Sequence, residues 1–177
     1  VYVCGLPWRH MPISFARFVG TFPVVYPDSK DTILSHLQID KMMTSIAFLN
    51  SEQKGRSIHE VMNFDGPIFL DCGIFQRGAY KKNFTCSDIS EYREKLIKWY
   101  TRLRPDVASS LDLPSPVTLD KEVKRERLIW SIENYNVMRT QVDTPLYLGL
   151  SVFSETDIRF TKKQIQKILG GDPELLG

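Results

Sequence analysis

The stretch SIHEVMNFDGPIFLDCGIFQ, residues 57–76, predicts a short helix followed directly by a buried strand. Its first apolar residues have the i, i+3, i+4 spacing of one helix face: Ile58, Val61 and Met62. The Asp-Gly-Pro turn at residues 65–67 cannot continue a helix, so we expect the helix to end near Phe64. Residues 67–70 are then an apolar run without alternation, which is typical of a parallel strand covered on both faces.

A carboxylate, Asp71, stands at the end of this predicted strand, just before Cys72 and Gly73. In β/α folds the carboxyl ends of the strands carry the chemistry, so Asp71 is a candidate catalytic residue. Asp and Gly are also common where strands end, and local composition alone favours a turn-forming role. Both interpretations of Asp71 are therefore open on these residues.

Two motifs in the same stretch resemble a known family and favour the catalytic interpretation. MNFDGPI at residues 62–68 and DCGIFQ at residues 71–76 resemble the MNWDGPI and DSGGFQ signatures of the tRNA-guanine transglycosylases. The match is dense, ungapped and specific. It makes a catalytic carboxylate the favoured role for Asp71.

Weaker similarity to the same family extends over residues 40–155. DVASSLD at residues 106–112, before a Pro-rich turn, resembles the family's strand that ends in Asp. The helix around Arg127 and Trp130 resembles the helix that follows that strand. LGL at residues 148–150 falls where the family has its GIVQGG strand.

The resemblance implies an enzyme that exchanges guanine for a 7-deazaguanine base, as in queuosine or archaeosine biosynthesis. Such exchange needs a nucleophile, an acid or base for the two bases, and fixed partners for the purine edge. By resemblance, Asp71 is the general acid/base and Asp112 binds the base, while Cys72, Phe75 and Gly149 are further substrate-binding residues. The target nucleotide must be exposed or flipped out, because its glycosidic bond cannot be reached inside a stack.

Two positions in the matched region depart from the family pattern. Ile74 replaces the second Gly of the GGFQ turn, which adds bulk and disfavours positive φ. Val152 falls near a base-binding Gln of the family and has neither donor nor acceptor. The family's nucleophilic Asp and its CxCxxC and His zinc site lie further downstream and have no counterpart here. We therefore expect no cofactor or metal in this chain, a structural zinc in a missing carboxyl-terminal part, and no exchange by this fragment alone.

Composition describes an ordinary soluble protein. The 177 residues are 42% hydrophobic and 25% charged, which suits one domain, and no apolar run is long enough to cross a bilayer. Three widely spaced cysteines suggest free thiols: Cys4, Cys72 and Cys86. These features predict a cytoplasmic protein without a membrane partner. Local basic clusters are candidate phosphate contacts, although such runs are usually solvated helix faces: Lys81-Lys82, Arg102 with Arg104, residues 121–127 and Lys162-Lys163.

The chain alternates between predicted strands and helices. Strands are expected at residues 2–6, 22–26, 43–49, 67–70, 107–111 and 146–151. Helices are expected at residues 31–37, 58–64, from Ser87 or Asp88 to Leu103, 118–141 and 163–169. The longest helix is expected to bury one side: Leu119, Val123, Trp130, Asn134 and Val137.

This alternation predicts a single α/β domain, residues 1–177, with a parallel sheet and crossover helices. It does not choose between an open sheet and a closed barrel. The family resemblance implies a (β/α)8 TIM-type barrel, but such barrels need about 250 residues and only about five βα units are countable here. We therefore expect a partial barrel, the amino-terminal portion of a longer protein.

Three hypotheses for function remain. The favoured one is guanine exchange in a nucleic acid, with tRNA as the substrate by family frequency and the DNA-modifying branch left open by the altered pocket. The second is a non-catalytic accessory or binding subunit of the same fold, which Ile74 and Val152 favour. The third is an unrelated α/β domain with a chance match. The resemblance also leaves homodimers and heterodimers open.

Overall fold

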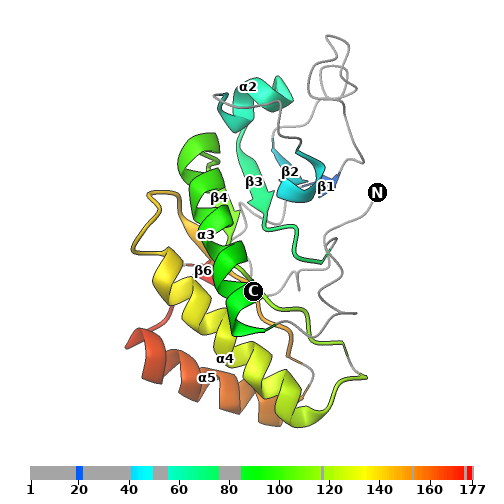
Figure 1. Cartoon of the computed structure of the whole chain (residues 1–177), viewed down its shortest axis with the longest axis vertical. Coiled ribbons are helices and arrows are strands. Elements are labelled where there is room, and N and C mark those ends of the chain that lie inside the picture. Colours follow the sequence, from blue (N-terminus) through cyan, green and yellow to red (C-terminus); the bar gives the residue numbers. More distant parts are fainter. Residues whose placement is uncertain are drawn as a thin grey trace.

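The computed structural model describes residues 19–21, 41–49, 56–75, 85–116, 118–152, 154–173 and 175–176. Within these ranges strands and helices alternate along the chain, as predicted (Figure 1). The elements predicted at residues 2–6, 22–26 and 31–37 lie outside the described residues, as do Lys81-Lys82.

The strands form one parallel sheet whose spatial order follows the chain. They are β1 (Val19–Thr21), β2 (Met42–Ser45), β3 (Ile68–Asp71), β4 (Val107–Ser109), β5 (Leu146–Leu148) and β6 (Leu175–Leu176). Each strand pairs with the one before it, so the order has none of the reversal that defines a doubly wound sheet. The predicted α/β class with a parallel sheet is confirmed, and the order is compatible with a sector of a (β/α) barrel.

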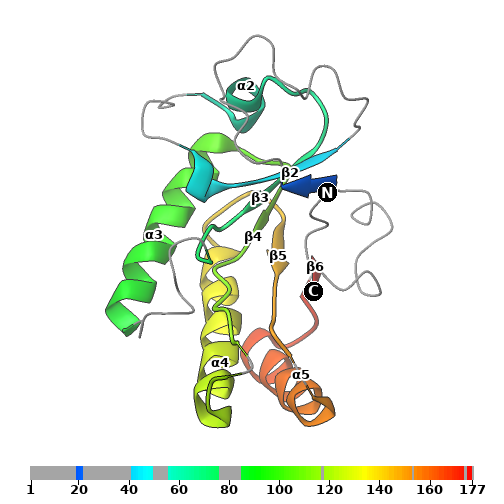
Figure 2. The same cartoon turned by 90° about the vertical axis from the view of Figure 1, so that its right-hand side faces the viewer.

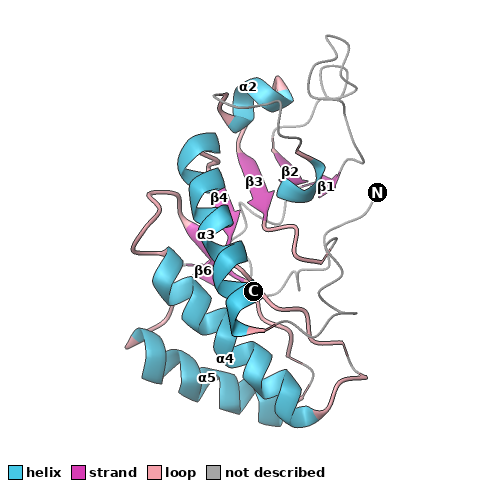
Figure 3. Cartoon of the chain, viewed as in Figure 1, coloured by secondary structure: helices cyan, strands magenta, loops and turns pink. Residues whose placement is uncertain are grey.

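Helices fill the connections and lie against the sheet. They are α2 (Ile58–Met62), α3 (Cys86–Leu103), α4 (Lys121–Met138) and α5 (Glu155–Leu169), with a 3-10 turn, η1 (Ile46–Phe48), after β2. The three long helices lie next to one another, α4 between α3 and α5 (Figure 2). Figure 3 shows these helices in cyan beside the strands in magenta, so the sheet is covered by a helical layer.

The two faces of the sheet differ in what they pack against. One set of alternating residues joins the helices in the main hydrophobic core: Met42, Ile68, Leu70, Ala108, Leu146 and Leu148. Residues on the opposite face are also buried, and there Phe69 of β3 meets Tyr147 of β5 edge to face, with ring centroids 5.6 Å apart. Asp71 is two residues beyond Phe69, so it projects from this second face, away from the helices.

Several predicted helix boundaries were wrong, and side-chain caps explain the differences. Helix α3 begins at Cys86 because Thr85 and Asp88 form a capping box around it. Helix α5 begins at Glu155, eight positions before the predicted start, because the Ser154 hydroxyl accepts the amide of Asp157. Strands β2, β4 and β5 end earlier than predicted, and β6 was not predicted.

The predicted buried side of α4 was also largely wrong. Val123, Trp130 and Val137 are only half-buried, and Leu119 lies before the helix; Asn134 is the correct member of that set. The residues that α4 buries include three polar ones that hydropathy does not mark: Arg127, Leu128, Ser131, Ile132, Asn134, Tyr135 and Met138. Helix α4 therefore turns a partly polar side toward the sheet, and this polar side supports the candidate site.

Candidate active site

Asp71 is the last residue of β3 and lies half-buried at the carboxyl edge of the sheet. Its Oδ2 accepts two hydrogen bonds of 3.0 Å, one from the Ser45 hydroxyl at the end of β2 and one from the Gly73 amide. Burial raises the pKa of Asp71, and these two donors, with Ser109 and the Cys72 amide, partly oppose that rise. The pKa of the Asp71 carboxyl group is therefore closer to neutral pH than the pKa of an exposed Asp.

The turn after Asp71 is fixed by Gly73, whose φ is +70°. A Cβ at this position would lie 2.9 Å from the Ala47 amide nitrogen and 3.0 Å from Cγ2 of Ile46, so η1 packs directly against the glycine. The next residue, Ile74, lies outside the left-handed region and packs in the hydrophobic core with 3% of its surface exposed. The Ile74 side chain, which distinguishes this turn from that of the family, is thus accommodated in the hydrophobic core.

Cys72 links Asp71 to Asp112. The Cys72 thiol donates a 3.0 Å hydrogen bond to Oδ1 of Asp112, which follows β4. Burial, followed by the charge of Asp71, raises the pKa of Asp112 to about 6, and the Cys72 hydrogen bond opposes this rise. Burial and the two carboxylates raise the pKa of the Cys72 thiol well above its usual value, so this thiol is a neutral donor.

Gly149, just after β5, completes the group on the next strand. A Cβ at this position would lie 3.4 Å from Oδ2 of Asp112, the oxygen that the thiol does not occupy. The glycine therefore leaves space beside that oxygen. The structure thus brings four of the predicted site residues together at the ends of three adjacent strands: Asp71, Cys72, Asp112 and Gly149.

Phe75, the fifth predicted site residue, has 58% of its surface exposed. It is the last described residue before residues 76–84, which lie outside the described part of the chain. Val152, which the resemblance places near a base-binding Gln of the family, is 38% exposed beyond β5. Both side chains are thus large apolar groups at the surface.

Helix α4 holds the segment that carries Asp112, and sequence reasoning missed this role. The Ser131 hydroxyl accepts the amide of Leu113 at 2.9 Å, and the Arg127 guanidinium donates to the carbonyl of Pro114. Arg127 is 7% exposed and Ser131 is 2% exposed. The Ser131 bond is therefore buried, and the Arg127 bond is partly buried. Arg127 was noted as part of a family-like helix, and its place inside a basic cluster concealed that it is buried.

Helix α3 supports the strand ends from the other side through two tyrosines. The Tyr92 hydroxyl donates to the carbonyl of Cys72 at 2.6 Å, and the Tyr100 hydroxyl donates to the carbonyl of Ser109 at 2.8 Å. The Ser109 hydroxyl in turn accepts a 2.7 Å hydrogen bond from the Cys72 amide. These tyrosines lie on the apolar side of α3, and nothing in the hydropathy pattern separates them from simple core residues.

The described basic clusters have structural partners. Arg102 lies over the ring of Trp99 at 4.1 Å, and Arg125 lies over the ring of Phe160 at 4.9 Å, near Glu122. Lys162 and Lys163 lie on α5, where both are exposed. Phosphate contact by these clusters stays a prediction.

Two features of the described residues concern metal ions and membranes. Among them, no group of three or more His, Cys, Asp or Glu side chains is arranged to hold a metal ion. In the same part of the chain, no helix combines the length and the apolar character that crossing a membrane requires.

Comparison with known proteins identifies archaeal relatives. The tRNA-guanine(15) transglycosylase of Methanocaldococcus jannaschii is 30% identical over 119 residues, 60% of this chain and 17% of that protein. The proteins of the same name from Methanothermobacter thermautotrophicus and Haloarcula marismortui are 28% and 26% identical, over 66% and 60% of this chain. These matches cover 19% and 22% of the two proteins, so the chain spans about a fifth of the length of its curated relatives.

No family model matches the chain. The several archaeal matches nevertheless agree with one another in name and in the share of this chain that they cover. They confirm the resemblance predicted from residues 62–76: the chain is similar in sequence to archaeal tRNA-guanine(15) transglycosylases.

Proposed function

We propose that the protein to which this chain belongs exchanges guanine for a 7-deazaguanine base in tRNA. The observation that carries this proposal is the pair of half-buried carboxylates, Asp71 and Asp112, joined through Cys72 at the end of adjacent strands. The names of the archaeal relatives support both guanine and tRNA as substrates. The complete fold would be a (β/α)8 barrel, to which β1–β6 would contribute consecutive strands.

Asp71 would act as general acid and base. Its raised pKa gives it a larger protonated fraction near neutral pH than an exposed Asp has, which suits a proton donor. Asp71 would give this proton to the departing guanine and would take a proton back from the incoming base. The nucleophile that holds the ribose between these steps would come from another part of the protein.

Asp112 would bind the pyrimidine edge of the base. Its Oδ1 already accepts a hydrogen bond from the Cys72 thiol. The oxygen available to the N–H groups of a guanine-like ring is therefore Oδ2, which lies beside Gly149. Only the ionised carboxylate accepts on both oxygens, so base binding would need Asp112 deprotonated. Phe75, exposed next to the turn, would contact the flat face of the base.

Incorporation of labelled guanine by the full-length protein tests this function. We expect incorporation into tRNA, and we expect Asp71→Asn to reduce it by at least a hundredfold because Asn cannot transfer the proton. Glu94→Gln, an exposed change on α3, is the control and should leave the rate unchanged. Duplex DNA as acceptor distinguishes the DNA-modifying branch. No incorporation into either acceptor, or an Asp71→Asn protein as active as the wild type, would refute the proposal.

A non-catalytic accessory subunit is the second candidate, and Val152 favours it. This residue offers no hydrogen-bonding group where the family places a base-binding Gln, and its side chain is exposed rather than part of a buried pocket. Such a subunit would use the barrel to bind RNA or a catalytic partner in a heterodimer, whereas the enzyme would act alone or as a homodimer. Measuring the size of the purified protein together with its guanine incorporation separates these two candidates.

A further inference from the structure

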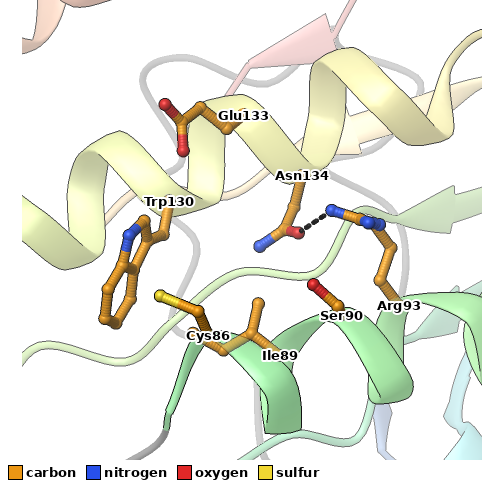
Figure 4. A pocket seen from close by; sticks show the side chains of 7 residues that line it. All are labelled: Cys86, Ile89, Ser90, Arg93, Trp130, Glu133 and Asn134. Atoms are coloured by element: carbon orange, nitrogen blue, oxygen red, sulfur yellow. Dashed lines mark hydrogen bonds between the residues drawn. The ribbon is translucent and has the colours of Figure 1, made fainter.

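A cavity of about 120 Å³ lies between α3 and α4, formed by residues other than the carboxylates described above. Figure 4 shows the side chains that line it: Cys86, Ile89, Ser90, Arg93, Trp130, Glu133 and Asn134. A water molecule takes up about 30 Å³ in the liquid, so this space exceeds the needs of a single ordered water. The cavity can therefore hold a small organic group.

Asn134 points an unused hydrogen-bond donor into this cavity. Its side chain is 2% exposed, and its Oδ1 accepts a 3.2 Å hydrogen bond from the Arg93 guanidinium. Because a guanidinium can only donate, this bond fixes the orientation of the amide and directs Nδ2 toward the space between Trp130 and Ile89 (Figure 4). Nδ2 has no partner within the described structure, and a buried amide without an acceptor is costly.

The walls of the cavity define what kind of acceptor fits. The exposed carboxylate of Glu133 lies on one side and disfavours an anion. The Arg93 charge is partly balanced by Glu94, which lies 3.8 Å from its Nε, and its Nη1 is engaged by Asn134. Ile89 and Trp130 supply apolar surface. A fitting ligand is therefore neutral, with one strong acceptor oxygen and a short apolar body.

We propose that this cavity is a binding site for small neutral amides or other small carbonyl compounds, whose oxygen accepts the free N–H of Asn134. The site is independent of the proposed base exchange. It uses side chains from α3 and α4, none of which is assigned a role in that reaction.

Cys86 makes the site measurable, because its thiol is exposed and its sulfur points toward the same space (Figure 4). Iodoacetamide is a neutral amide that alkylates thiols: a carbon–sulfur bond forms, iodide leaves, and the thiol proton passes to buffer. We expect its rate at Cys86, followed by peptide mass spectrometry, to saturate with concentration. Propionamide should protect Cys86 with half-protection in the millimolar range, which is typical of so few atoms. If the iodoacetamide rate does not saturate and propionamide does not protect Cys86, the proposal is overturned and the cavity binds only water.

Variants identify the donor. Asn134→Leu keeps the branched shape of the side chain and removes the N–H, so saturation and protection should be lost and the rate at Cys86 should fall severalfold. Asn136→Leu makes the same change two residues along α4, outside the cavity, and should behave like the wild type.

Glu133→Gln provides a second measurement that does not need Asn134 to be replaced. It should raise the rate of the anionic reagent iodoacetate severalfold while leaving that of iodoacetamide unchanged. Equal protection by propionamide in the wild type and in a folded Asn134→Leu protein, or no change with iodoacetate, would contradict the assignment.

Discussion

The thiol of Cys72 donates a hydrogen bond to Oδ1 of Asp112 across 3.0 Å and joins two segments that are 40 residues apart in the chain. Burial keeps the thiol protonated, so it acts as a donor to a carboxylate that burial and Asp71 would otherwise push further toward its neutral form. The residue in the family's usual Ser position therefore lowers the pKa of the residue proposed to bind the base, against the larger effects of burial and Asp71.

The first prediction concerns this hydrogen bond. Cys72→Ala removes the donor, so the pKa of Asp112 should rise above its present value of about 6. Cys72→Ser offers a stronger donor and should lower that pKa below the wild-type value. Carbon-13 NMR titration of the Asp carboxyl groups measures both changes. Cys86→Ser, at an exposed thiol, is the control; identical Asp112 titrations in all four proteins would show that the Cys72 contact has no energetic effect.

The second prediction concerns stability and pH. The pKa of Asp112 is raised from 3.8 to about 6, so between these values the folded state binds more protons than the unfolded state. The free energy of unfolding should therefore fall as pH rises through this window, and the full cost should be present above about pH 6. Asp112→Asn removes the cost and should stabilise the protein by about 1 to 3 kcal/mol near pH 7.5, because one pKa unit is worth about 1.4 kcal/mol and partial exposure reduces the effect.

Urea denaturation at several pH values measures this difference. The stabilisation by Asp112→Asn should vanish near pH 4, where the wild-type carboxyl group is also neutral. Asp120→Asn makes the same chemical change at an exposed position and should alter stability by no more than about 0.5 kcal/mol. A constant difference between pH 4 and pH 7.5 would mean that Asp112 does not titrate in this range.

The third prediction assigns a positioning role to Arg127. Arg127→Met keeps the aliphatic stem but leaves the Pro114 carbonyl without its buried donor, so the segment that carries Asp112 should loosen. We expect guanine binding to weaken about tenfold, roughly 1.4 kcal/mol, by calorimetry. The pH midpoint of binding should stay the same, because burial and then the charge of Asp71, rather than Arg127, raise the pKa of Asp112.

Two further substitutions keep the Arg127 prediction testable. Arg139→Met, at the exposed end of α4, should bind guanine like the wild type. Arg127→Lys retains a donor and should restore part of the lost affinity if Arg127→Met folds poorly. Unchanged affinity in Arg127→Met would restrict Arg127 to a purely structural role.

The elements predicted correctly from the sequence are those specified by turn residues and by the spacing of apolar residues. The helix and strand around residues 58–71 follow from spacing and a turn, and the position of Asp71 at the strand end follows from both. The α4 face was largely missed because Arg127 and Ser131 are polar yet buried, whereas Asn134 was placed on the correct side. Hydrophobic periodicity assigns such residues to solvent, and only their tertiary partners reverse that assignment.

The candidate site shows the same division. The motif at residues 71–76 identified Asp71 and Cys72, whereas the contact between Cys72 and Asp112 depends on pairing of β3 with β4. The hydrogen bonds of the Tyr92 and Tyr100 hydroxyls could not be predicted, because both rings lie among the buried residues of α3. The spacing of apolar residues on a helix indicates that a tyrosine ring is buried. It does not indicate which group accepts the hydrogen bond of its hydroxyl.

The fourth prediction separates backbone strain from steric clash at the turn after Asp71. Gly73 and Gly170 both have φ near +70°, but a Cβ at Gly73 would meet η1 while one at Gly170 would meet nothing within 4 Å. Gly170→Ala should therefore cost about 1 kcal/mol, and Gly73→Ala should cost about 2 kcal/mol or more. Gly171→Ala, with neither feature, should cost about 0.5 kcal/mol at most. Thermal denaturation of the three proteins measures this order, and equal costs at Gly73 and Gly170 would show that η1 yields without penalty.

The fifth prediction uses the space beside Asp112. A Cβ added at Gly149 would lie 3.4 Å from Oδ2 of Asp112, which is at the close limit of ordinary contact, and φ there is not positive. Gly149→Ala should therefore fold with nearly wild-type stability, yet the methyl group would occupy the approach to the oxygen proposed to bind the base. We expect guanine affinity to fall at least tenfold while the melting temperature changes by a few degrees at most. Because the fold is expected to survive, retained affinity in Gly149→Ala would mean that the base does not approach Asp112 from the side of β5.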